Sequence, residues 1–161
     1  MSSSALRPAL RVPAQLLLVL VMAFGLLLAS PVGDAHAATR GKKVLNGTQV
    51  ALRQLGDPYR YGAAGPNAFD CSGLIYYSYR KAGLSVPRTS STLANASRRI
   101  AKKNLKRGDL MFFHNGGRVY HVGVFLGRKN GKVRMLHSPS TGSRVSRTTP
   151  WTSSWYAGTL R

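Results

Sequence analysis

The second half of the chain contains short apolar segments separated by turns, with no helical pattern between them. Five segments are expected to form strands: Leu110–Phe113, Tyr120–Leu126, Lys132–His137, Arg144–Arg147 and Tyr156–Leu160. Parallel strands need long crossover connections that usually contain a helix, whereas antiparallel strands can be joined by short turns. The sequence therefore predicts an antiparallel meander, with Asn130-Gly131 as the turn of one hairpin.

Helical segments come before these strands. Gln49–Leu55 has apolar residues at helical spacing and ends at Gly56. A longer helix is expected from Cys71 to just before Gly83, because a glycine commonly follows the last turn of a helix.

A third, short helix is expected to be capped by Ser90 or Ser91 and to end at Ala96. Residues 38–47 are expected to be a loose, basic lead-in, and residues 98–103 a charged connection. Helices followed by a run of strands favour an α+β fold, in which N-terminal helices pack on an antiparallel β-sheet.

The alternation within residues 120–126 assigns side chains to the two faces of the sheet. Tyr120, Val122, Val124 and Leu126 are expected on one face, and His121, Gly123 and Phe125 on the other. Trp151 and Trp155 are expected to belong to an anchoring segment next to the last strand.

Residues 1–37 have the three parts of a signal peptide. A basic start is followed by the apolar stretch Leu16–Leu28 and by the small-residue cleavage site Ala35-His36-Ala37. The apolar stretch is short for a membrane span of about 20 residues. We therefore expect a secreted protein that is not inserted in a membrane after cleavage, with an uncleaved N-terminal anchor as the alternative.

The chain is strongly basic. It has 24 Lys and Arg residues against 4 Asp and no Glu, and removal of residues 1–37 leaves 22 basic and 3 acidic residues, a net charge of +19. Such a charge attracts polyanions. For an exported protein we expect anionic wall polymers as partners, rather than a specific nucleic acid. The alternative is that the charge only keeps the protein soluble.

Cys71 is the only cysteine, so it cannot form a disulfide within the chain. An unpaired cysteine in a secreted protein is linked to another chain or is a free reactive thiol, whereas a buried apolar residue is the alternative. Cys71 lies where a loop meets a predicted helix, and the positive end of a helix favours the thiolate. The helix dipole supplies at most about 2 kcal/mol, so we expect a second activator, such as a histidine.

Two histidines are expected to meet at one end of the predicted hairpin. His121 lies near the start of one strand and His137 near the end of its partner. Opposite residues of an antiparallel pair have Cβ atoms about 4.5–5.5 Å apart, and diagonal neighbours about 7–8 Å. If Cys71 packs against this end, the site contains a thiol, a base and a residue that orients the base. Gly123, on the same predicted face as His121, would leave room for a substrate.

A zinc site is the alternative arrangement for the same three residues, since a cysteine and two histidines can bind zinc. The separations between positions 71, 121 and 137 fit no compact zinc motif, so we expect no metal and no cofactor. His114 is expected in a turn or on the surface, outside this arrangement.

Several motifs, in order along the chain, resemble the NlpC/P60 family of cysteine peptidases. They are Asp57-Pro58-Tyr59 through Asp70-Cys71-Ser72-Gly73-Leu74, Val86–Ser90, Arg107–Phe113, His121–Gly127 and Leu136–Pro139. The resemblance covers residues 48–161 and implies a papain-like α+β fold. It also implies hydrolysis of cell-wall peptides, commonly at the bond between D-glutamate and a diamino acid.

The resemblance implies roles for individual residues. Cys71 resembles the nucleophile, His121 the base and His137 the third, polar member of the site. Three residues are implied to contact the substrate, the last two at its amine end: Tyr59, Asp70 and Ser72. The alternative roles are loop packing for Tyr59 and helix capping for Asp70.

The expected function is therefore that of a secreted, monomeric endopeptidase that cleaves peptidoglycan peptides through an acyl-enzyme on Cys71. One alternative keeps the fold and changes the reaction to that of an amidase or acyltransferase on another substrate. The other is a non-catalytic, cationic protein that binds the envelope or nucleic acid.

Overall fold

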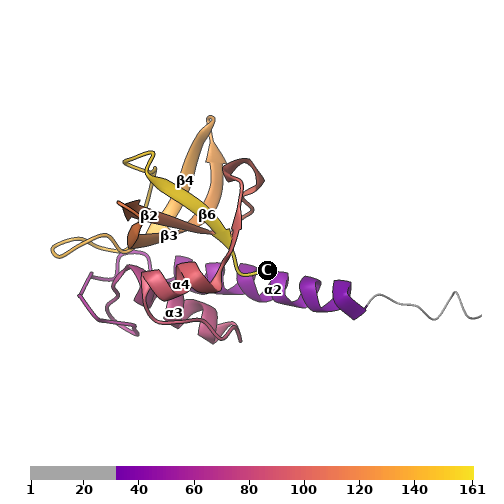
Figure 1. Cartoon of the computed structure of the whole chain (residues 1–161). Coiled ribbons are helices and arrows are strands. Elements are labelled where there is room, and N and C mark those ends of the chain that lie inside the picture. The colour runs from indigo at the N-terminus through magenta and orange to yellow at the C-terminus, as the bar shows by residue number, and fades with distance from the viewer. Residues whose placement is uncertain (1–31) are drawn as a thin grey trace, which may run out of the picture. The chain divides into compact units, whose positions relative to one another are not determined.

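A six-stranded antiparallel sheet forms one layer of the fold in the computed structural model, which describes residues 32–161. Its strands are β1 (Arg98–Ile100), β2 (Leu110–Asn115), β3 (Arg118–Lys129), β4 (Lys132–His137), β5 (Ser146–Thr148) and β6 (Trp155–Thr159). Their spatial order is β1-β6-β2-β3-β4-β5 (Figure 1). The predicted α+β class with an antiparallel sheet is confirmed.

The simple meander is wrong at one edge of the sheet. The C-terminal strand β6 lies between β1 and β2 and pairs with both of them. Residues 98–103, expected as a connection, instead contain β1 and a 3-10 turn, η1 (Lys102–Asn104). Pairing with a segment more than 50 residues away makes residues 98–100 a strand, and no local pattern reports such a partner.

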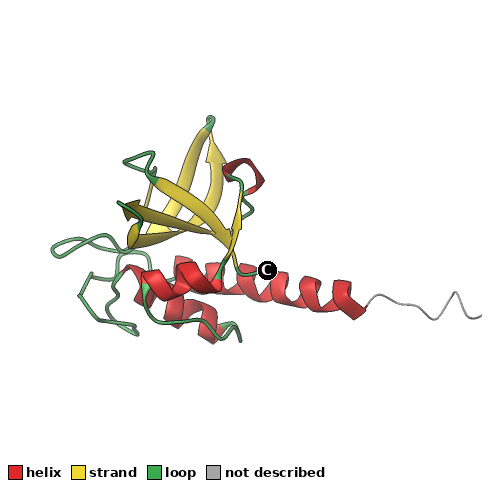
Figure 2. Cartoon of the chain, in the orientation of Figure 1, coloured by secondary structure: helices red, strands yellow, loops and turns green. Residues whose placement is uncertain are grey.

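The remaining elements are the helices α2 (Val32–Leu52), α3 (Cys71–Lys81) and α4 (Ser90–Ala96). Figure 2 distinguishes these helices from the strands and loops of the sheet. The predicted extents of α3 and α4 are confirmed, and Gly83 follows α3 with a positive φ of 78°. The cap of α4 is Thr89 rather than Ser90 or Ser91, because Thr89 and Thr92 form a reciprocal capping box.

The expected loose lead-in is wrong, because residues 38–47 are helical and belong to α2. The buried residues Val44, Gly47, Thr48 and Ala51 recur on one face of this helix. A Cβ at Gly47 would lie 2.9 Å from the Tyr79 ring, so this glycine allows α2 to approach α3 closely. Close tertiary packing therefore outweighs the low helix propensity of glycine.

The expected signal peptide lies mostly outside the described residues, and it stays a prediction. Its proposed cleavage site, Ala35-His36-Ala37, lies within α2. In the described part of the chain, residues 32–161, no helix combines the length and apolar character that a membrane span needs. The sheet, α3 and α4 all belong to one compact unit, His36–Arg161.

Both faces of the sheet carry apolar side chains. The larger cluster joins the helices to the sheet, and its members include Val44, Leu74, Tyr79, Leu93, Phe112, Val122 and Leu136. A second cluster covers the opposite face: Met111, Phe113, Phe125, Met135, Trp155 and Ala157. Trp155 thus has the anchoring position expected for it, in a sheet that is buried on both sides.

A bulge in β3 changes the expected faces near the site. Phe113 pairs with His121 and His114 pairs with Val119, so Tyr120 is an extra residue between two paired ones. Tyr120 is therefore 49% exposed, and Val119 occupies the buried position that was expected for Tyr120. Bulges bend a strand and redirect side chains, and this one lies directly beside His121.

Candidate active site

Cys71 is the first residue of α3, as expected, and its thiol lies against Val122 of β3. The backbone N–H groups of Val122 and Ser72 donate hydrogen bonds toward the thiol. Since Val122 follows His121 in β3, the start of α3 brings the thiol to the strand segment that carries this histidine. The predicted contact between the helix start and this end of the sheet is therefore present.

His121 and His137 meet as predicted, with His121 Nε2 and His137 Nδ1 3.0 Å apart. The pairing of Val124 with Leu136 in β3 and β4 places the two histidines as diagonal neighbours. Their rings are perpendicular, with centroids 5.2 Å apart. Only one of the two facing nitrogens can carry the shared hydrogen, so each histidine constrains the tautomer of the other.

Burial keeps the resting site uncharged. His121 and His137 are 5% and 6% exposed. Burial, together with the charge of His137, lowers the pKa of His121 to about 3, and burial lowers the pKa of His137 to about 4. Burial also raises the pKa of Cys71, despite the N–H groups that donate to it. The N–H groups at the helix start lower the pKa of Cys71, but burial outweighs them, so the helix start alone does not give a thiolate.

Gly123 has a different role from the one expected. A Cβ at this position would lie 3.1 Å from Met135 Sδ, 3.2 Å from the Leu136 carbonyl oxygen and 3.7 Å from His137 Cβ. The absent side chain therefore accommodates β4 and the second histidine, and does not open space for a substrate.

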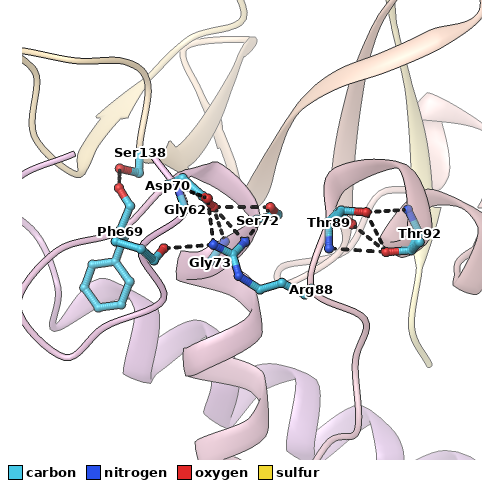
Figure 3. A network of polar contacts seen from close by, with 10 residues as sticks. Gly62, Phe69, Asp70, Ser72, Gly73, Arg88, Thr89, Thr92 and Ser138 are labelled. Carbon is cyan, nitrogen blue, oxygen red and sulfur yellow. Dashed lines mark hydrogen bonds and ion pairs between the residues drawn. The ribbon is translucent and has the colours of Figure 1, made fainter. Parts of the chain in front are cut away.

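The Asp70 carboxylate organises the loop in front of α3, as Figure 3 shows. One oxygen, Oδ1, accepts hydrogen bonds from Gly73 N (2.6 Å), Arg88 Nη1 (2.9 Å) and the Ser72 hydroxyl (3.3 Å). The other, Oδ2, accepts from Gly62 N (3.0 Å) and Arg88 Nη2 (2.7 Å). Asp70 is therefore the N-cap of α3 and also half of an ion pair.

Arg88 determines the charge state of Asp70. Burial opposes ionisation of the carboxyl, but hydrogen bonds from Arg88 and Gly73 outweigh it and lower the pKa of Asp70. The same hydrogen bond raises the pKa of Arg88. Arg88 also donates to the Ala63 carbonyl (3.2 Å) and the Ser72 hydroxyl (3.0 Å). Arg88 lies in one of the sequence motifs, but the sequence alone assigned it no role, although a buried acid needs a partner.

A cleft of about 590 Å³ contains Cys71 together with the three predicted substrate-binding residues, Tyr59, Asp70 and Ser72. Arg88 also lines it. Burial, with the nearby Cys71 and Asp70, raises the pKa of Tyr59. Cys71 and the three predicted substrate-binding residues thus share one concave surface, which is where a substrate of Cys71 would lie.

A smaller cleft of about 320 Å³ opens over the histidine pair, and Tyr120 borders both this cleft and the one at Cys71. His114 lines neither of them, in agreement with its expected place outside the site. Within residues 32–161, no three His, Cys, Asp or Glu side chains are placed to hold a metal ion.

Trp151 is a component of the site that sequence reasoning missed. Its ring stacks on Phe113 at 4.3 Å with an interplanar angle of 7°. It also meets His121 at 5.2 Å and His137 at 5.6 Å. Because it is 53% exposed, Trp151 covers the histidine pair on one side and faces solvent on the other. The sequence assigned it to anchoring, since nothing local links residue 151 to the histidines.

Replacement of Arg88 tests the ion pair. Arg88→Met is expected to lower the free energy of unfolding at pH 7 by about 2 kcal/mol, because the carboxylate of Asp70, 12% exposed, loses its countercharge. The loss should shrink below about pH 4, where Asp70 is protonated in the unfolded chain. Urea denaturation measures both effects. Arg98→Met, on the exposed edge strand β1, is the control; equal losses in the two variants would contradict the ion-pair role.

Replacement of Trp151 tests the cover over the histidines. In the wild type both imidazoles stay neutral at pH 5, because their pKa values lie near 3 and 4. Trp151→Ala admits water and is expected to raise both pKa values toward about 6.5, whereas Trp151→Phe keeps an aromatic cover. NMR titration of the ring protons measures this shift. Wild-type histidines that titrate near pH 6.5 would overturn the argument.

The same lowered pKa values affect stability. Below pH 6.5 the unfolded chain takes up protons that the folded chain does not, so the free energy of unfolding decreases as the pH drops, until about pH 3, where both histidines are also protonated in the folded chain. Trp151→Ala should flatten this dependence, by an amount that follows the NMR shift.

Comparison with known proteins places this geometry in a family. Residues 56–161 match the NlpC/P60 family. The chain is 39% identical over 141 residues to the murein DD-endopeptidase MepH of Escherichia coli strain K12, an alignment that covers 80% of this chain and 49% of MepH. The chain thus spans about half the length of the curated relatives it matches.

Two solved structures from Mycobacterium tuberculosis have the same fold. The peptidoglycan hydrolase RipB has a TM-score of 0.67 at 27% identity, with coverage of 88% of this chain and 77% of RipB. RipD, a non-catalytic NlpC/p60 domain protein adapted to peptidoglycan binding, has a TM-score of 0.62 at 25% identity, with coverage of 74% and 98%. The fold, the matched residues and the identity to MepH agree, and the chain belongs to the NlpC/P60 family.

Proposed function

We propose that the protein is a cysteine-type endopeptidase that hydrolyses the stem peptides of peptidoglycan. The observation that carries this proposal is the arrangement at the start of α3. There the thiol of Cys71 accepts a hydrogen bond from Val122, which follows His121 in the chain, and His121 belongs to a histidine pair whose nitrogens are 3.0 Å apart. A thiol, a base and a group that orients the base are the components of nucleophilic acyl transfer.

The hydrogen bond between the histidines determines which ring nitrogen of His121 can accept the proton of Cys71. Because Nε2 of His121 faces His137, Nδ1 of His121 is the nitrogen left for the thiol. We propose that His121 carries its hydrogen on Nε2 and donates it to His137 Nδ1. In this tautomer Nδ1 has a free lone pair that can accept the proton of Cys71. His137 acts by orienting the ring and fixing its tautomer.

The reaction then proceeds in two halves. The Cys71 sulfur attacks the carbonyl carbon of the substrate as its proton passes to His121, and the oxyanion lies near the first backbone N–H groups of α3. Collapse breaks the C–N bond, and the proton on His121 goes to the leaving amine. Water, deprotonated by His121, then cleaves the thioester and releases the acid and the thiol.

Proton transfer within this site is the demanding step. Both groups are neutral at rest, so forming the thiolate requires moving a proton onto a buried imidazole. The transfer is favourable only when it accompanies bond formation, where the charge on sulfur is consumed. We therefore assign His121 the role of a general base during attack, a role worth about 10²–10⁴-fold in rate.

Substrate binding is proposed at the cleft that Tyr59, Asp70 and Ser72 share with Cys71. The carboxylate of Asp70 already accepts five hydrogen bonds. A substrate ammonium must therefore share Asp70 with Arg88 or displace one of its donors. The Tyr59 hydroxyl is not part of this network, and we propose that it contacts the substrate directly.

The bond between D-glutamate and a diamino acid is the proposed cleavage site. The relative MepH is a DD-endopeptidase, so a D–D bond is the specific alternative. The similarity to RipD favours a second candidate function, peptidoglycan binding without catalysis. These three possibilities differ in their products, and the third gives none.

Product masses test the mechanism and the bond together. The wild type, incubated with purified wall fragments, is expected to release fragments cut between D-glutamate and the diamino acid. Cys71→Ala should lower the rate at least about 10³-fold, since the nucleophile is lost. His137→Gln, which retains an acceptor for His121, should keep more activity than His137→Ala. Unchanged cleavage by Cys71→Ala would overturn the mechanism. Products cut at a D–D bond would instead identify that bond as the cleavage site.

We further propose that residues 1–37 direct export and that the remaining charge of +19 concentrates the protein on anionic wall polymers. Binding of the Cys71→Ala variant to purified walls should weaken steeply between about 50 mM and 500 mM salt, because surface charges are screened. Sedimentation measures it. Binding that does not change with salt would contradict the electrostatic part of this proposal.

A further inference from the structure

We propose that a separate cleft beside Trp151 receives the leaving-group side of the substrate, and that Arg118 there binds a carboxylate on the leaving amino acid or peptide. This inference rests on the proposed endopeptidase function and adds a specificity to it. It concerns a surface that the sequence did not single out.

The cleft has a volume of about 670 Å³ and lies at one end of the sheet. The turn between β2 and β3 and the loop that enters β6 form it: His114, Asn115, Arg118, Tyr120, Trp151, Thr152 and Ser154. The pairing of Phe113 with both His121 and Trp155 brings these two segments together. A hydrogen bond from His114 N to the Ser154 carbonyl (3.2 Å) joins them further.

The position of this cleft relative to His121 identifies which half of a substrate it can take. Trp151 lines it with one part of its surface and meets the His121 ring at 5.2 Å. In the proposed reaction, His121 delivers a proton to the leaving nitrogen. The leaving group must therefore extend from the histidine pair, whereas the acyl group extends into the cleft that holds Cys71 and Asp70.

Tyr120 and Arg118 border the two clefts. Tyr120 also borders the small cleft over the histidines, so this half-exposed residue lines all three clefts. A peptide that crosses Tyr120 would have its scissile bond near the thiol and its leaving group over Trp151.

The charge of this cleft selects the chemistry of the leaving group. No acidic side chain lines it, and Arg118 is its one arginine. Among residues 32–161 the ion pairs are Arg88–Asp70 and Arg161–Asp109, so no carboxylate of the described chain neutralises Arg118. An arginine presents paired donors that match a carboxylate. Asn115, Thr152 and Ser154 add neutral hydrogen-bonding groups around it.

Three synthetic stem peptides test the assignment. The first is L-Ala-γ-D-Glu-diaminopimelate with free carboxylates. The second has the carboxylates of the leaving diaminopimelate converted to carboxamides. The third has only the α-carboxylate of the acyl-side D-Glu converted. Steady-state kinetics are measured for the wild type, Arg118→Gln, Arg118→Lys and the control Arg98→Gln, which removes an exposed charge from an edge strand outside the clefts.

Arg118→Gln is expected to lower kcat/KM for the first and third peptides about tenfold, mainly through KM, and to leave the second peptide nearly unchanged. Arg118→Lys should restore part of the loss, and Arg98→Gln should behave as the wild type. An equal loss on all three peptides, or a loss that disappears with the acyl-side carboxamide, would overturn the inference. Failure of the wild type to cleave any of the three peptides would instead overturn the D-glutamyl cleavage site of the proposed function.

Discussion

The Asp70 carboxylate is the interaction on which the site depends. It caps α3, holds the loop at Gly62 and pairs with Arg88, so a single buried charge fixes three segments around Cys71. Helix starts leave backbone N–H groups unpaired, and a carboxylate at this point satisfies one of them while it is stabilised by the helix dipole. The orientation of the first turn of α3, and hence of the thiol, follows from that charge. The cost of burying it is offset by the guanidinium of Arg88.

Exclusion of water from the histidine pair is the second property of the site. Trp151, Phe113 and the two strands exclude water from the histidines, which stay neutral far below the usual pKa of imidazole. A neutral base beside a neutral thiol avoids the large penalty of an isolated buried charge. With both groups neutral at rest, an imidazolium and a thiolate would form only during the proposed reaction. In the proposed mechanism, the reactivity of this site is thus conditional on a bound acyl group.

Much of the site could be predicted because its signals are local or follow from strand periodicity. Cys71 was identified by being the single cysteine at a helix start, and the meeting of His121 and His137 follows from hairpin geometry alone. The residues that sequence reasoning missed, Arg88 and Trp151, act through contacts across 18 residues and about 14–30 residues, and no local pattern encodes them. The extent of α2 and the strand at residues 98–100 were missed for the same reason, since tertiary packing decides both.

The place of β6 in the sheet has a consequence for how the protein matures. β6 lies between two strands that precede it in the chain, so β1 has no sheet partner and β2 only one until residues 155–159 pair with them. Without these residues the second apolar cluster lacks Trp155 and Ala157, and the segment that bears Trp151 is held at the sheet only when β6 is paired. This order of assembly delays a complete site until residues 155–159 are paired in the sheet.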